Sequence, residues 1–135
     1  MLELSEAARS TAGVVVLAAI TVTSGGWFLT RVVRGKVPVT DFQMGFYRAG
    51  HAHAGALITL GLVCLILADA TSLTGAAGWL ARSGVLFSAI LMPAGFFLSA
   101  IGAGRTQPNG LIALVYAGAA LLIAGLATLG YGLLT

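Results

Sequence analysis

The chain has 135 residues, of which 59% are hydrophobic and only 8% are charged. A soluble domain carries about a quarter charged residues. Seven basic and four acidic side chains are therefore too few to cover a soluble protein of this size, and we predict an integral membrane protein. The net charge of +3 is small, and the basic residues lie beside apolar runs. That placement indicates orientation in a membrane rather than nucleic-acid binding.

Hydropathy divides the chain into four apolar segments, each long enough to cross a bilayer as a helix. They form a single transmembrane domain over 1–135, with helices expected at about 12–33, 42–69, 78–104 and 109–134. Because the connections are short, neighbouring helices should be antiparallel. The predicted fold is an all-α four-helix bundle in a membrane.

Two local signals refine these limits. Thr40 and Gln43 have the spacing of a capping box, in which each side chain bonds to the other residue's backbone N–H. The second helix should therefore begin at Asp41. Pro93 falls inside the third segment, where its ring removes one backbone hydrogen bond and should kink the helix.

Basic residues are unevenly divided between the two ends of the predicted helices. Five lie at the end that holds the first and third connections, namely Arg31, Arg34, Lys36, Arg48 and Arg105. The other end has two, Arg9 and Arg82. Lys and Arg concentrate on the cytoplasmic side of membrane proteins. This asymmetry predicts that both termini lie outside the cytoplasm. The membrane that we expect is a bacterial inner membrane.

Two histidines lie within the second apolar segment. The uninterrupted apolar stretch after His53, residues 54–68, is shorter than the roughly 20 residues that a spanning helix needs. His51 and His53 should therefore lie inside the membrane, with Arg48 at its edge. Ionisable side chains at that depth are costly and are candidates for function.

Helical spacing separates the two imidazoles. Arg48, His51, Gly55 and Thr59 share one face at 3.6 residues per turn. His53 is two residues from His51, about 200° around the helix, so the two rings point in nearly opposite directions. Both cannot bind one metal ion from one regular helix.

Three functions are compatible with this arrangement. The first is a site at His51 and His53 for haem, which needs one or two nitrogen ligands and an apolar slot, or for a transition metal with Met44 and Met92 as further ligands. Such a site would suit a subunit of a redox complex. The second is a pore or carrier for protons or a small anion, which uses Arg48 and His51 as its polar groups.

The third function is a structural accessory subunit of a membrane complex, in which the histidines fix helix packing. No nucleophile constellation is present, so we expect no catalytic residues and no independent catalysis. The expected partners are the lipid bilayer and either further copies of the chain or a larger membrane complex. We expect no nucleic acid.

The segment Arg48-Ala-Gly-His-Ala-His-Ala-Gly55, with Pro108-Asn109 before the last helix, resembles a group of small four-helix bacterial membrane proteins of unknown function. That resemblance covers most of the chain and implies the fold but no activity. The His-x-His helix also resembles histidine-bearing helices of haem–copper membrane proteins, over about ten residues. It implies haem or metal binding by imidazole, although those proteins carry further histidines on other helices and this chain does not.

Overall fold

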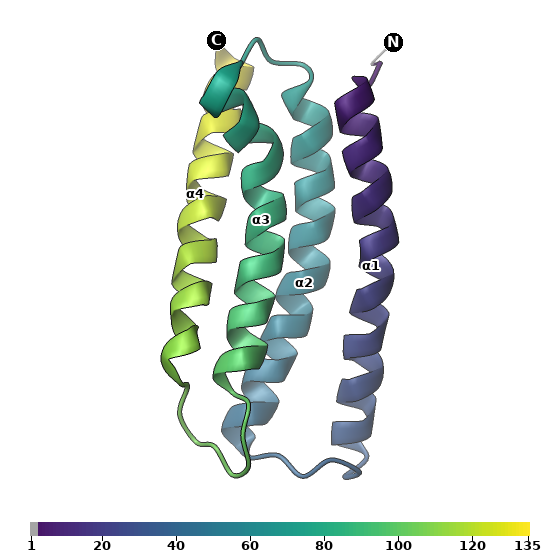
Figure 1. Cartoon of the computed structure of the whole chain (residues 1–135), viewed down its shortest axis with the longest axis vertical. Helices are drawn as coiled ribbons and strands as arrows, with labels where there is room; N and C mark the ends of the chain where they lie inside the picture. Colours follow the sequence, from purple (N-terminus) through teal and green to yellow (C-terminus); the bar gives the residue numbers. More distant parts are fainter. Residues whose placement is uncertain (1–2) are drawn as a thin grey trace.

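The computed structural model describes residues 3–135 and is all-helical over that range. Its helices are α1 (Glu6–Val33), α2 (Asp41–Ala68), α3 (Gly75–Ser99) and α4 (Ala113–Leu134), with a short 3₁₀ turn η1 (Gly110–Ile112) before α4. The four long helices run up and down side by side, and both chain ends lie at the same end of the molecule (Figure 1). The prediction of a four-helix all-α fold is confirmed, and each long helix is apolar and long enough to cross a membrane.

The start of α2 agrees with the sequence. The Thr40 hydroxyl accepts the N–H of Gln43, and the Gln43 side chain accepts the N–H of Thr40, which completes the capping box. The Thr40 hydroxyl also donates to the carbonyl of Arg105. The first turn of α2 is therefore attached to the connection between α3 and α4.

Helix limits differ from those expected from hydropathy at the starts of α1, α3 and α4 and at the end of α3. α1 begins at Glu6, several residues before the apolar run, because the Ser5 hydroxyl caps the helix by accepting the N–H of Ala8. α3 ends at Ser99, before the apolar run ends. The following chain turns through Gly102 and Gly104, which have φ angles of 124° and 63° that glycine adopts without strain.

Helices α2, α3 and α4 form the core, and glycines allow α3 and α4 to approach closely. A Cβ atom built on Gly84 would lie 3.1 Å from the Cα of Gly125, and one on Gly95 would lie 2.7 Å from the backbone N of Val115. Small residues at such contacts let helix backbones pack where lipid supplies no hydrophobic drive.

Helix α1 is set apart from this core. Within residues 3–135 its backbone comes close to that of α2 and to no other helix. One end is tied by Ser5, whose backbone N–H donates to the Asp69 carboxylate at 2.8 Å. Nearer the other end, the rings of Phe28 and Tyr47 pack edge to face with centroids 5.3 Å apart. Between these ties, α1 is separated from α3 by a groove.

Candidate functional site: a groove beside α1 that contains His51

Both histidines lie on the continuous helix α2. His51 and His53 are half-buried, whereas Arg48, one turn earlier, is exposed. No loop or helix break lies between them, since α2 is helical from Asp41 to Ala68. The imidazoles are therefore held by a regular helix, as the sequence predicted.

His51 faces α1 at a pair of glycines. A Cβ on Gly25 would lie 3.2 Å from Nδ1 of His51, and a Cβ on Gly26 would lie 3.4 Å from its Nε2. The two glycines form a notch that accommodates the imidazole. Among residues 3–135, neither ring nitrogen of His51 takes part in a hydrogen bond, unlike that of His53.

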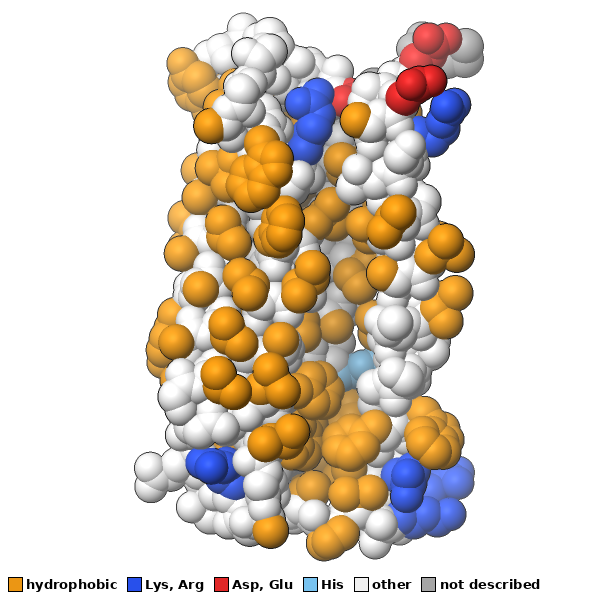
Figure 2. Space-filling view, viewed as in Figure 1, with side chains coloured by type: hydrophobic (Ala, Val, Ile, Leu, Met, Phe, Trp, Pro, Cys, Tyr) orange, Lys and Arg blue, Asp and Glu red, His pale blue; other side chains and the backbone are white. Residues whose placement is uncertain are grey.

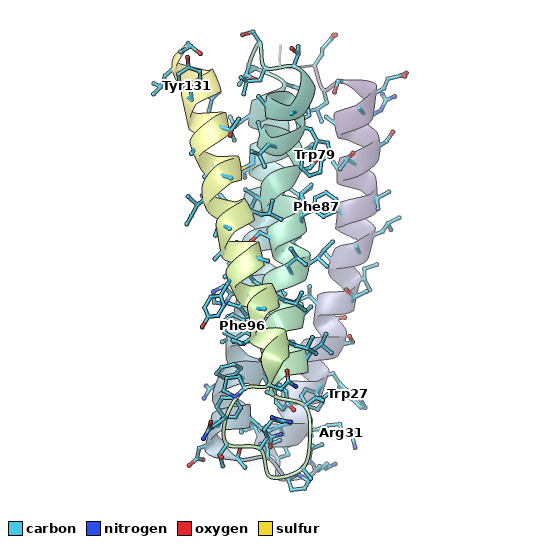
Figure 3. The ribbon with its side chains drawn as sticks, turned by 60° about the vertical axis from the view of Figure 1, so that its left-hand side comes forward. Trp27, Arg31, Trp79, Phe87, Phe96 and Tyr131 are labelled. Atoms are coloured by element: carbon cyan, nitrogen blue, oxygen red, sulfur yellow. The ribbon has the colours of Figure 1, made fainter. Side chains whose placement is uncertain are left out.

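A groove of about 770 Å³ runs between α1, α2 and α3, with His51 near one end. In the space-filling view of Figure 2, a pale-blue imidazole is visible in the recess beside α1. Trp79 and Phe87 line the other part of the groove and lie on the side of α3 that faces α1 (Figure 3). Ligand sites commonly have volumes of about 300–1,000 Å³ and apolar walls with few polar groups.

The two hydroxyl groups on the α1 wall that lie nearest to His51 along the helix are already bonded within α1. Thr21 donates to the carbonyl of Ala18, and Ser24 donates to the carbonyl of Thr21. These hydroxyls lose their donor capacity to the helix backbone. Around the middle and at the His51 end of the groove, the imidazole is therefore the polar group that remains available to a ligand.

The polar stripe predicted on α2 is present in part. His51, Gly55 and Thr59 line a second groove of about 400 Å³ together with residues of α1, which confirms that these three share a face. Arg48 does not line it. The Thr59 hydroxyl donates to the carbonyl of Gly55 at 3.0 Å, so this groove also has few free polar atoms.

His53 has different neighbours, as its helical position required. Its Nδ1 lies 2.8 Å from the carbonyl oxygen of Ala49, and its ring centroid lies 5.0 Å from that of Phe96 on α3. With Nδ1–H donating to that carbonyl, Nε2 carries a free lone pair. A backbone carbonyl on one ring nitrogen is one of the usual ways to orient a metal-binding histidine.

The predicted additional ligands lie elsewhere. Met92 is buried in the core, where it packs against Gly118 of α4. Met44 is half-buried, and neither thioether lines the groove that contains His51. Residues 3–135 also contain no cluster of three or more His, Cys, Asp or Glu side chains that could hold a metal ion.

Two features of the site were not predicted. The first is the notch formed by Gly25 and Gly26. It could not be predicted because the sequence does not tell which helix faces His51, although a glycine pair within a helix is a signal of close approach.

The second is the network at Asp69, at the other end of α2. The Asp69 carboxylate accepts hydrogen bonds from Ser5 and, at 3.0 Å, from Arg82. The N–H of Ser5 and then the Arg82 guanidinium hold the pKa of the Asp69 carboxyl below its usual value, against the opposing effect of burial.

Charge is distributed so that the His51 end of the groove is nearer the basic end of the molecule. Arg31, Arg34 and Lys36 lie at the end of α1 and in the connection to α2, and Figure 2 shows blue side chains gathered there. At the opposite end, Figure 2 shows acidic side chains together with further blue ones. The Arg31 guanidinium lies 5.1 Å from the ring centroid of Trp27.

No family model, curated protein or solved structure matches this chain.

Proposed function

We propose that the protein is an integral membrane protein that binds haem at an intramembrane histidine site, with His51 as the nitrogen ligand. The observation that supports this most directly is the His51 imidazole, which lines an apolar groove of about 770 Å³ and takes part in no hydrogen bond within residues 3–135. Haem needs one or two nitrogen ligands and an apolar pocket. When bound, it would supply one-electron chemistry, in keeping with a subunit of a redox complex.

The donor set favours haem over a bare transition-metal ion. A metal ion held by side chains alone requires three or four ligands, and no such cluster is formed within residues 3–135. One imidazole is enough to ligate haem on one side. Met44 and Met92 keep a role as ligands only if a second chain or a rearrangement brings them to the site.

A second copy of the chain offers a second imidazole. His53 faces away from the His51 groove, and its Nδ1 is occupied by the Ala49 carbonyl, which leaves Nε2 for a ligand outside the chain's own bundle. Homo-oligomers are usually symmetric, so two copies would present two equivalent nitrogen atoms. We therefore extend the proposal to a homo-oligomer or a larger membrane complex.

The proposed orientation follows from the basic end of the molecule. The residues around 31–36 carry three positive charges, and such clusters concentrate on the cytoplasmic side. Both termini lie at the opposite end (Figure 1), so they would lie outside the cytoplasm of a bacterial inner membrane. His51 would then belong to the cytoplasmic half of the bilayer.

Transport is the second candidate, and the groove formed by His51, Gly55 and Thr59 with α1 is the feature that favours it. Histidine relays protons near neutral pH, and Arg48 lies one turn away. However, Thr59 and the α1 hydroxyls donate to carbonyls of their own helices. A proton or anion would find few free polar groups along this path, which makes haem binding the stronger proposal.

Absorption spectroscopy of the detergent-purified protein, as isolated and after titration with haem b, tests the proposal. We expect a strong visible band that His51→Gly removes and that added imidazole restores, because the freed space accepts the ligand. His53→Ala is the matched variant on the same helix and should keep a band. Circular dichroism verifies that each variant remains helical.

Two results would overturn the proposal. One is the absence of bound haem and of any spectral change on titration of a helical, monodisperse protein. The other is a band that persists unchanged in His51→Gly. Proton or chloride flux into liposomes that depends on Arg48 and His51, without haem binding, would instead support the carrier.

A further inference from the structure

A different groove, of about 580 Å³, lies at the basic end of the molecule. It is bounded by α1 around Gly25 and Phe28, by the start of α2, and by the connections at 37–39 and 101–103. Helix α2 has 28 residues, or about 42 Å, which exceeds a hydrocarbon core of about 30 Å by about 6 Å at each end when the two are centred. The groove then lies where acyl chains meet headgroups.

The polar side chains that line this groove are already hydrogen-bonded. The Nε2 of Gln43 donates to the carbonyls of Ala100 and Gly102. The Tyr47 hydroxyl donates to the carbonyl of Ala100, and Ser24 donates within α1. The other side chains of the wall are apolar and include Phe28, Val37, Val39 and Phe97. Such a wall suits a hydrocarbon chain.

Three basic side chains surround this groove, and we call Arg31, Lys36 and Arg105 the basic rim. Arg31 is one turn after Phe28 on α1, and Lys36 directly precedes the part of the α1–α2 connection that lines the groove. The Arg105 side chain lies against the third wall, because its Nε donates to the carbonyl of Ile101 at 2.9 Å. The three residues belong to separate segments, so the fold gathers their charges around one groove.

The basic rim has no anionic partner within the described chain. Over residues 3–135 the single ion pair joins Arg82 to Asp69, at the opposite end of the molecule. Asp41 is the acidic residue at the basic end, and it is exposed. Within the same range, the Nη2 of Arg105 takes part in no hydrogen bond, whereas its Nε and Nη1 donate to carbonyls. Positive groups beside a hydrocarbon wall are complementary to an amphiphile with an anionic head.

We propose that this groove binds an anionic phospholipid, whose phosphate lies at the basic rim and one of whose acyl chains enters the groove. Arginine suits phosphate because its guanidinium donates parallel N–H bonds to two oxygens. A second copy of the chain in the same orientation would bring its own basic end to this level, where like charges oppose docking. The inference goes beyond the proposed function and does not depend on haem.

The chain has two tryptophans, and each reports on the lipid at one end. Trp27 lies beside Arg31, and Trp79 lies towards the opposite end (Figure 3). Trp79→Phe and Trp27→Phe therefore leave one reporter each. Both proteins are placed in phosphatidylcholine vesicles with increasing amounts of brominated phosphatidylglycerol or, for comparison, brominated phosphatidylcholine. Bromine quenches tryptophan fluorescence at short range.

We expect quenching of Trp27 to show brominated phosphatidylglycerol enriched about fivefold or more over its bulk fraction, since one basic group has about that effect near an anionic lipid. Trp79 should show no such enrichment, because the nearby Arg82 is paired with Asp69. Free glycerol phosphate should not relieve the quenching of Trp27, because it has no acyl chain for the groove.

Three variants of the protein that retains Trp27 locate the headgroup. Arg105→Gln should lower the enrichment about fivefold. Lys36→Gln changes an exposed side chain and should lower it as well, which tests the rim even if circular dichroism shows that Arg105→Gln loses its helices. Arg48→Gln removes the same charge at the same end but does not line the groove. It is the matched control and should keep the enrichment.

Any of four results would overturn the inference. Equal quenching of Trp27 by the two brominated lipids would show that no anionic lipid is selected. Equal enrichment at Trp79 would contradict a site at the basic end. An enrichment that falls as far in Arg48→Gln as in the rim variants would reflect general surface charge. Relief of quenching by glycerol phosphate would identify a soluble phosphate ester as the ligand.

Discussion

The contact between α3 and α4 at Gly95 gives a direct test of the fold. A Cβ at this position would lie 2.7 Å from the backbone N of Val115 and 3.1 Å from the Cβ of Leu114. Because one of these atoms is backbone, a rotamer change cannot relieve the clash, and α4 must move. Overpacking of this kind costs about 1–3 kcal/mol. Gly95→Ala should therefore destabilise the protein despite the better helix propensity of alanine, which is worth about 1 kcal/mol.

Gly130→Ala isolates the steric cost. Gly130 is also inside a helix, and a Cβ there would have no atom within 4 Å. The propensity gain is shared by both variants, so Gly95→Ala should be less stable than Gly130→Ala by about 1–3 kcal/mol. Unfolding in mixed micelles with rising SDS, followed by circular dichroism, measures the difference. Equal stability of the two variants would show that α3 and α4 do not approach at Gly95.

Two further predictions concern polar contacts at the ends of the bundle. Asp69→Asn should destabilise the protein by about 1–3 kcal/mol. The pKa of the Asp69 carboxyl is lower in the folded protein than in the unfolded chain. The ionised carboxylate therefore stabilises the wild-type protein above the unfolded-state pKa, and this stabilisation is lost as the pH falls through the folded-state pKa. Chemical unfolding at a series of acidic pH values should reveal a pH-dependent component that is missing in the variant, and identical profiles would contradict the Ser5–Asp69–Arg82 network. Gln43→Ala should also cost about 1–3 kcal/mol, because Gln43 is 4% exposed and its Nε2 donates to the carbonyls of Ala100 and Gly102 at 2.8 and 2.7 Å. The same unfolding assay on Gln107→Ala, an exposed amide, is the control, and a similar loss in both variants would contradict this account.

The attachment of α1 explains how a groove is maintained in so small a bundle. α1 is fixed near its start by Ser5 and Asp69 and near its end by Phe28 against Tyr47. Glycines at 25 and 26 bring it close to α2 where His51 lies. Between these points, a groove remains between α1 and α3. A ligand in the groove would supply the missing contacts, so we expect haem to raise the thermal stability of the protein.

The helices of this fold follow from the residue pattern along the chain. Long apolar runs with few charges leave helices as the structures that satisfy every backbone hydrogen bond without water, and Thr40 with Gln43 located the start of α2 within one residue. The opposite directions of His51 and His53 followed from helical periodicity. These properties are local, so they depend only on the spacing of residues along the chain.

Which neighbour each histidine contacts depends on the arrangement of the four helices. Hydropathy cannot tell that His51 lies over Gly25 and Gly26, that His53 lies beside Phe96, or that Asp69 pairs with Arg82. The end of α3 at Ser99 also depended on contacts from Gln43, a residue about sixty positions away. Such contacts depend on how the helices are rotated and spaced against each other, and in a chain whose faces are nearly all apolar, hydrophobic patterning leaves that rotation undetermined.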